Sequence, residues 1–299
     1  MAAAEITDSL EADAFKKLYP DQFYARFIAD GIRPDGRPLG RARTASIGLG
    51  AVSTADSSAL VKFGNSTALA GIKLEIMVPK DDTPNQGQLS IAVEMAPMCS
   101  PDMRPGRPSD AAQVLVEQLN NALLASAKAV NLDDLCIDPG KAAWVAYLDI
   151  YVLDSDGSLA DVTLLAAVAA LATLRLPHVA VTDGGNVVPS SEAAEAAAPD
   201  EMAVEPTKLQ LRSVPLALTC GLYKDQLIVG LTAEEEALVA TSVTTIVDDQ
   251  GRLIGQLKAG GRAEMDIARL QDCIEAAKLR YAELAGILQQ AITQYDGSG

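Results

Sequence analysis

The sequence has one histidine, and aromatic residues make up only 4% of its 299 residues. A histidine-rich zinc site is therefore excluded, and a Ser-His-Asp or Cys-His enzyme would have to use His178 itself. His178 follows Leu176-Pro177, where we expect a helix to end and a strand to begin, so a structural role is favoured. With so few aromatic residues, the core must be built mainly from Ala, Val, Leu and Ile.

Paired cysteines and nucleotide-binding glycine motifs are also lacking. The four cysteines lie far apart and form no CxxC pair, which fits neither a disulfide framework nor a zinc ribbon and indicates a reducing compartment: Cys99, Cys136, Cys220 and Cys273. Neither GxGxxG nor GxxxxGK occurs, so dinucleotide or P-loop nucleotide binding has no support. We expect neither a cofactor nor a metal site.

Positive charge is scarce, since 24 Lys and Arg face 40 Asp and Glu and give a net charge of −16. This argues against a free-standing nucleic-acid binder, which needs a basic face for phosphates. The N-terminus lacks the basic start and apolar run of a secretory signal. The most apolar stretch, 162–174, is shorter than the about 20 residues that cross a bilayer. We therefore expect a soluble, intracellular protein that binds no membrane.

Hydrophobic periodicity predicts a helical extension and then a module in which strands and helices follow one another. Residues 1–30 place Phe15, Phe23 and Phe27 at helical spacing and form the extension. The first module covers residues 31–182. Its expected elements are two strands around the turn Gly64-Asn65, a strand over 89–95, a helix over 109–130 with Ser109 as N-cap, a strand over 143–153 and a buried Ala-rich helix over 159–174.

Residues 183–207 contain no Lys or Arg and form an acidic, flexible loop before the second module, 208–299. The expected elements there are strands near 209–220 and 226–230, a capping box from Thr232 to Glu235, a hairpin around 248–251 and a final helix. That helix has an apolar stripe that fits either a coiled coil or packing on its own sheet, and the second is favoured: Ile267, Leu270, Ile274, Ala277, Tyr281, Leu284 and Leu288. The fold class is therefore α+β, with two β-then-α modules.

Several segments carry motifs in a specific order and at a specific spacing. They include Arg33-Pro34-Asp35-Gly36-Arg37, Lys62-Phe63-Gly64-Asn65-Ser66-Thr67, Cys99 through Pro108, Asp156-Gly157-Ser158-Leu159 and Val243 through Gly251. Together they resemble the RNase PH family, and more narrowly the non-catalytic ring subunits of the eukaryotic RNA exosome, over about residues 30–295. The resemblance implies an RNase PH-like fold with helices packed on mixed sheets.

The resemblance also implies which positions an active member would use for RNA phosphorolysis. Active members carry Gly-Thr-Arg where a strand turns into a helix, and the helix N-terminus and the arginine hold the phosphate. Here these positions are Gly157-Ser158-Leu159, and Asp161, one turn later, is expected to repel phosphate. Two positions that hold acids in active members are Ser213 and Gly230.

These replacements favour a structural subunit of the exosome core ring that supports 3′–5′ RNA processing and degradation, including rRNA maturation and mRNA decay, by scaffolding and RNA threading. The implied partners are other RNase PH-like ring subunits, cap subunits with RNA-binding domains, an associated 3′–5′ exoribonuclease, and RNA in the assembled channel. The implied locations are nucleus, nucleolus and cytoplasm. One alternative is an active phosphate-dependent 3′–5′ exoribonuclease with displaced catalytic groups. Another is an RNA-binding module acting alone, which the net charge disfavours.

Basic residues in two segments, together with Lys62, are candidates for contact with RNA phosphates. Arg104 and Arg107 flank a Pro-rich loop and could face either RNA or a partner. Lys62, on a hairpin strand, is a weaker candidate. A second cluster, Arg33, Arg37, Arg41 and Arg43, enters a sheet, and pairing with acids is favoured there over contact with RNA.

Overall fold

The structure, a computed structural model, describes residues 14–99, 109–181, 187–189 and 206–297. Its first half contains α2 (Pro20–Ala29), β1 (Ala45–Leu49), β2 (Ser57–Phe63), β3 (Ser66–Met77), β4 (Gln88–Met95), α3 (Asp110–Asn120), the π-helical turn η1 (Asn121–Ser126), the 3-10 turn η2 (Leu132–Leu135), β5 (Cys136–Asp138), β6 (Ala142–Asp154) and α4 (Leu159–Thr173). The second half contains β7 (Arg175–Leu176), β8 (Val179–Val181), β9 (Val187–Pro189), β10 (Thr207–Lys208), β11 (Leu216–Tyr223), β12 (Gln226–Val229), α6 (Ala233–Leu238), β13 (Thr241–Val247), β14 (Leu253–Leu257) and α7 (Ile267–Asp296). Both halves combine a mainly antiparallel sheet with helices packed on it, which confirms the α+β class.

The first sheet has the strand order β1-β2-β3-β6-β4, and β5 adds to β6. Its pairs are antiparallel except β4 with β6, which run parallel and are joined through α3. The β2–β3 hairpin turns at Gly64, whose φ of +57° suits glycine, as the sequence predicts. Ser109 caps α3 by accepting a hydrogen bond from the Ala112 N–H at 3.1 Å. The predicted helix over 109–130 changes to the π-helical turn η1 after Asn120.

The second sheet is antiparallel, with the order β12-β11-β13-β14, and every residue of β11 is buried. The strand predicted near 209–220 begins only at Leu216. The residues before Leu216 pair instead with the segment that follows η1. Leu211 forms a β-bridge with Val130, and the Arg212 N–H donates to the Ala129 carbonyl. Apart from 187–189 and 206–207, the predicted acidic loop lies outside the described residues.

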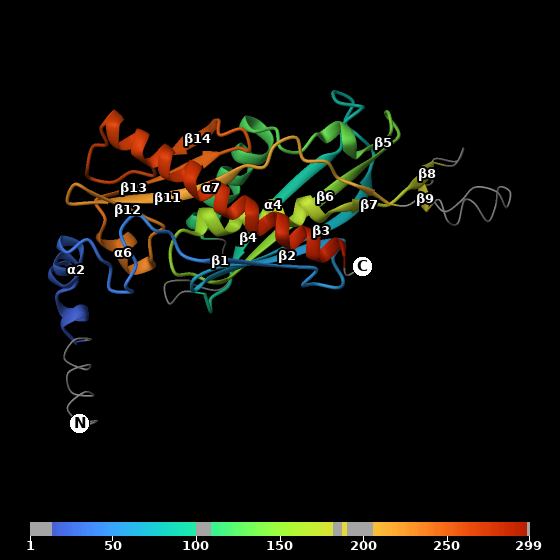
Figure 1. The fold of residues 1–299 in the computed structure, drawn as a ribbon. Coiled ribbons are helices and arrows are strands. Elements are labelled where there is room, and N and C mark those ends of the chain that lie inside the picture. Colours follow the sequence, from blue (N-terminus) through green and yellow to red (C-terminus); the bar gives the residue numbers. More distant parts are fainter. Residues whose placement is uncertain (1–13, 100–108, 182–186, 190–205, 298–299) are drawn as a thin grey trace, which may run out of the picture.

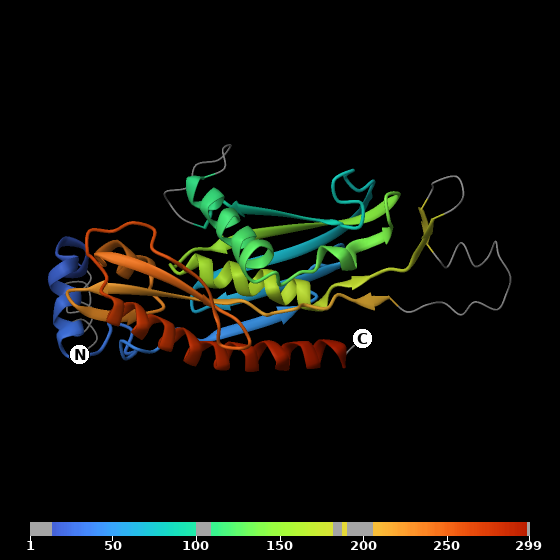
Figure 2. The same ribbon diagram turned by 90° about the horizontal axis from the view of Figure 1, so that it is seen from above.

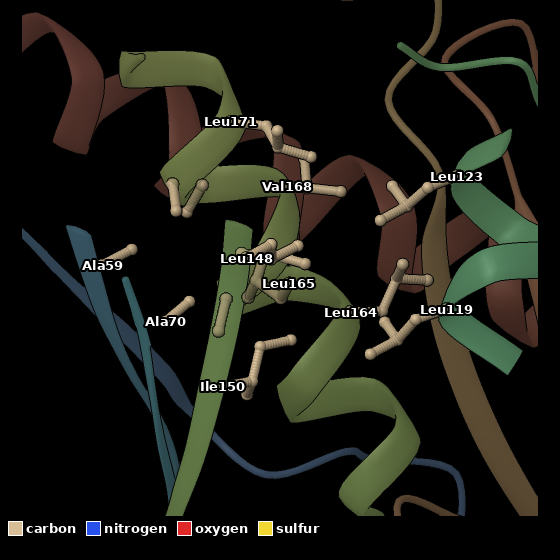
Figure 3. Packing of buried hydrophobic residues seen from close by; sticks show 14 of the residues in the cluster. Ala59, Ala70, Leu119, Leu123, Leu148, Ile150, Leu164, Leu165, Val168 and Leu171 are labelled. Atoms are coloured by element: carbon tan, nitrogen blue, oxygen red, sulfur yellow. The ribbon is translucent and has the colours of Figure 1, made fainter. Parts of the chain in front are cut away.

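Helix α4 lies between the two sheets, in contact with β2 and β3 on one side and β11 on the other (Figures 1 and 2). Residues 161–171 of this helix are all buried. Small side chains such as Ala59 and Ala70, both fully buried, let it approach the first sheet (Figure 3). Leu164 points toward Leu119, so α3 shares the same core (Figure 3). The prediction of a buried Ala-rich helix is confirmed.

Helix α7 runs along the molecule and packs on β1, β11 and β13, so it covers its own sheet and reaches the first one (Figure 2). Leu284 and Leu288 of the predicted stripe are buried. Ile267 is not, because it lies in the first turn, ahead of the buried part that begins at Cys273; its side chain is 77% exposed. No helix in the described part of the chain has the length and apolarity needed to cross a membrane.

Helix α2 docks on the end of the second sheet (Figure 1). Tyr24 and Ile28 are buried there against Tyr223, Ile228 and Leu231. Within the predicted N-terminal extension, residues 20–29 form a helix that docks on the core of its own chain. Residues 1–13 lie outside the described residues.

The tight approach of α4 to the first sheet predicts that Ala70→Leu is destabilising. The larger side chain has no room at a fully buried position and should lower the free energy of unfolding by about 2 kcal/mol. Chemical denaturation measures this. Ala92→Leu, on the exposed side of β4, is the control and should change stability by less than about 0.5 kcal/mol. Equal losses in the two variants would contradict this packing.

Candidate functional site

The start of α4 meets the start of α6, and glycine makes this approach possible. Gly157 has a φ of +78°, and a Cβ there would lie 2.7 Å from the Thr232 carbonyl carbon and 2.8 Å from the Ala233 nitrogen. Such distances exclude any side chain. The next residue, Ser158, takes the left-handed conformation with a φ of +51° and is almost fully buried.

At the start of each of these two helices, a carboxylate accepts a hydrogen bond from a backbone N–H group. Glu236 of α6 accepts a hydrogen bond from the Ser158 N–H at the start of α4, at 2.7 Å. In return, Asp156 accepts one from the Ala233 N–H at the start of α6, at 3.2 Å. The Ser158 hydroxyl donates to the Leu231 carbonyl at 3.0 Å and so fixes the same contact. Each helix therefore has an anion at its positive end, supplied by the segment facing it.

Glu236 titrates in a mixed environment. Desolvation by the surrounding protein raises the pKa of its carboxyl above the ordinary value, while the Ser158 N–H and the positive charge of Arg43 act in the opposite direction. The sequence predicts the neighbouring capping box, and Thr232 and Glu235 do form it. The sequence gives no signal that the Glu236 side chain turns toward α4, because its direction depends on how the two modules pack.

Arg43 stabilises the turn that precedes α4. Its guanidinium donates to the carbonyls of Asp156 at 2.6 Å and Gly157 at 2.8 Å, and it lies 3.4 Å from the Asp156 carboxylate. Burial lowers the pKa of Arg43, and the nearby charge of Asp156 opposes this. Arg280 of α7 donates to the Arg43 carbonyl, which joins the last helix to the same turn.

Arg33 is fully buried and donates to the carbonyls of Leu39, Val229 and Gly230, with Glu235 at 3.3 Å. Burial lowers its pKa, and Glu235 opposes the shift.

Three of the four arginines between residues 33 and 43 pair with acids of this chain, as the sequence predicts: Arg33 with Glu235, Arg37 with Asp35 and Arg43 with Asp156. Arg41 is exposed and forms none of the ion pairs found among the described residues.

Asp161 differs from its predicted role. Its carboxylate does not stand at the start of α4 but accepts hydrogen bonds from the Thr219 N–H at 2.9 Å and the Thr219 hydroxyl at 2.8 Å. It therefore joins α4 to β11 in the interior. Burial raises the pKa of Asp161 to about 6, although both hydrogen bonds oppose the shift. The acid that faces the Ser158 amide is Glu236 instead.

Only some of the positions that the resemblance assigns to an active site lie close together. Gly230 lies beside Ser158 at a cavity of about 10 Å³, enough for about one water molecule. A Cβ at Gly230 would lie 3.2 Å from Ala42 Cα at a φ of +63°, so an acid there would be strained. Ser213 is buried and donates to the Ala127 carbonyl at 3.1 Å. Leu159 packs against the large hydrophobic core, half-buried.

Of the predicted RNA contacts, only Lys62 falls among the described residues. Lys62 is exposed on β2, opposite Ser46 and Thr67 of the neighbouring strands. Arg104 and Arg107 lie outside the described residues. Within the described part of the chain, no group of three or more His, Cys, Asp or Glu residues could hold a metal ion.

The family of this chain follows from comparison with models of known protein families. Residues 41–177 match the model of the 3′ exoribonuclease family, domain 1, named RNase PH, and residues 213–280 match domain 2 of the same family. The chain belongs to the RNase PH family. Both helix starts described above fall within these matched regions.

Individual relatives cover nearly the whole chain. The exosome complex component Rrp42 of Aeropyrum pernix is 33% identical over 264 residues, which are 87% of this chain and 91% of the relative. The exosome complex component rrp43 of Schizosaccharomyces pombe is 33% identical over 273 residues, covering 91% and 96%. A chain of the Archaeoglobus fulgidus exosome with RNA bound to the active site superimposes with a TM-score of 0.74 at 26% identity, covering 91% of this chain and 99% of that chain. The RNase PH-like fold is thus confirmed.

The carboxylate at the start of α4 predicts a stability order among variants at position 236. Glu236→Ala removes the acceptor for the Ser158 N–H and should lower the free energy of unfolding by about 1 kcal/mol. Glu236→Gln keeps an acceptor oxygen without the charge and should lose less. Chemical denaturation at neutral pH gives the order, and a neutral effect of Glu236→Ala would contradict the capping role.

The raised pKa of Asp161 predicts a pH-dependent difference between the protein and Asp161→Asn. The native carboxyl binds its proton more tightly than the unfolded one, so its contribution to stability falls as the pH rises from about 4 to about 6. Asparagine can accept from the Thr219 N–H and donate to its hydroxyl oxygen without any charge. Relative to the wild type, Asp161→Asn should therefore gain up to about 3 kcal/mol between pH 4 and pH 8.

Denaturation at a series of pH values tests the Asp161 prediction. Asp149→Asn, an exposed substitution on β6, is the control. Parallel stability profiles for Asp161→Asn and the wild type would contradict the prediction.

Proposed function

We propose that this chain is a structural, non-catalytic subunit of an exosome core ring that supports 3′–5′ RNA processing and degradation. The observation that carries the proposal is the similarity to exosome components over about nine-tenths of the chain, including both RNase PH domains. In a ring of similar subunits, neighbours share head-to-tail interfaces.

The non-catalytic part of the proposal rests on the start of α4. An active member needs free N–H groups and a cation there for phosphate, but the Ser158 N–H is taken by the Glu236 carboxylate. Leu159 contributes no charge, and Gly230 contributes no acid. Arg43, the nearest cation, donates to the Asp156 and Gly157 carbonyls. A phosphate would have to displace an anion from a site that lacks the expected arginine.

The partners we propose are other RNase PH-like ring subunits, cap subunits with RNA-binding domains and an associated 3′–5′ exoribonuclease. RNA would pass through the assembled channel, where a few cations such as Lys62, Arg104 and Arg107 would contact phosphates without reading sequence. The net charge of −16 makes the partners the main source of basic charge along the channel.

We propose nucleus, nucleolus and cytoplasm as locations. The module boundaries of the sequence analysis, 31–182 and 208–299 with an acidic loop at 183–207, are kept in this proposal.

Affinity purification of the tagged chain followed by activity measurement tests the proposal. We expect other RNase PH-like exosome proteins to co-purify with it. We also expect the chain alone to release no nucleoside diphosphate from oligo(A) with magnesium and phosphate, because the phosphate site is occupied by Glu236.

A known phosphorolytic RNase PH serves as the positive control for the activity arm. A stable monomer without exosome partners would refute the ring role. Diphosphate release that is abolished by mutating one acid of this chain would refute the non-catalytic role.

A further inference from the structure

Strand β14 (Leu253–Leu257) is an open edge of the second sheet. Among the described strands it pairs only with β13, so its outer N–H and C=O groups face no strand. Protected edges usually carry inward-pointing charges or proline, but here Leu253 and Leu257 are 46% and 40% exposed. An exposed edge with two leucines is a template for pairing with another chain.

Gly255, between these leucines, leaves space for an approaching backbone. A Cβ built at Gly255 meets no atom within 4 Å, and its φ is not positive, so the turn chemistry that usually selects glycine is absent. Glycine inside a strand often marks a place where another backbone comes close. The register passes a bulge beside Val247, and regular pairing resumes from Gly255 to Leu257.

A pocket of about 170 Å³ opens beside the same strand. Its walls come from β14, β13, β11, α3, η1 and α4, and they include Leu115, Leu119, Leu164 and Ile254. Neither Lys, Arg, Asp nor Glu lines it. Gln118 also lines it, and the Oε1 atom of Gln118 is buried without a hydrogen bond among the described residues. An apolar side chain that carries one donor, such as Trp or Tyr, would match these walls and this acceptor.

Two exposed cations follow the end of β14. Residues 252–262 contain Arg252, Lys258 and Arg262 but no acid, although Asp248, Asp249, Glu264 and Asp266 flank them and Arg252 pairs with Asp248 at 2.7 Å. Lys258 and Arg262 are exposed and form none of the ion pairs found in the described part of the chain. These cations favour an acidic ligand beside the strand.

We propose that β14 binds an extended, acidic segment of a partner protein, which adds a strand to the sheet and inserts an aromatic side chain into the pocket. Main-chain pairing along Gly255–Leu257 would supply affinity, and the pocket and Lys258 and Arg262 would supply specificity. Single-stranded RNA fits less well, because neither the strand nor the pocket offers an aromatic ring for base stacking. The proposal does not rest on the ring function.

Selection of twelve-residue peptides from a displayed library on the full-length chain tests the proposal. We expect selected peptides to be rich in Asp and Glu and to share one Trp or Tyr. Hydrogen exchange on the full-length chain with a selected peptide should show new protection at residues 253–257. Fluorescence anisotropy of the labelled peptide then gives the Kd for each variant.

Two variants target the two parts of the surface. Gly255→Val adds a branched side chain at the wall of the pocket, where the partner's aromatic ring would lie, and should weaken binding at least tenfold. Gly286→Ala, at an equally open glycine of α7, should leave binding unchanged. Lys258→Glu with Arg262→Glu should weaken binding about tenfold, while the matched reversal of the exposed Lys80 and Lys128 should have little effect. Unchanged unfolding midpoints establish that the variants are folded.

Four results would overturn the proposal. They are failure to select any peptide, selection of basic peptides, protection confined to another part of the chain, or equal binding by Gly255→Val and the wild type. Competition of the selected peptide by single-stranded oligo(U) at this strand would assign the surface to RNA instead.

Discussion

The burial of α4 is the constraint on which the rest of this structure depends. A helix enclosed between two sheets cannot expose the N–H groups at its start to water, so the protein must supply acceptors there. The acceptor at Ser158 is Glu236, a carboxylate placed where the helix dipole favours negative charge. In an enzyme that uses phosphate, the substrate anion would occupy such a position. Here a side chain of the same chain accepts that hydrogen bond.

This contact also joins the two modules. Glu236 and Asp156 each reach across to the other helix start, and Asp161 extends the connection from α4 into β11. Arg43 and Arg280 then hold the turn to α7, which itself spans both sheets. The buried arginines satisfy carbonyl groups that the tight turns leave unpaired. The positive charges of Arg43 and Arg280 are thus used inside the chain.

Much of this fold could be predicted because its signals are local. The hairpin at Gly64, the cap at Ser109 and the box from Thr232 to Glu235 each depend on residues close in sequence. Asp161 shows where this reasoning ends: its place near the start of α4 suggested repulsion of phosphate, but its partner is Thr219, 58 residues later. Glu236 was missed for the same reason, since only the packing of α6 on α4 distinguishes it from the acids beside it. Ile267 fits the apolar period of α7, yet the helix reaches the core only one and a half turns later.

We propose that Glu236, and not phosphate, occupies the start of α4. An experimental structure of the purified chain in concentrated inorganic phosphate tests it most directly. We expect the Glu236 carboxylate to accept the hydrogen bond from the Ser158 N–H, with no phosphate between α4 and α6. A phosphate bound to the Ser158 N–H with Glu236 turned away would contradict it.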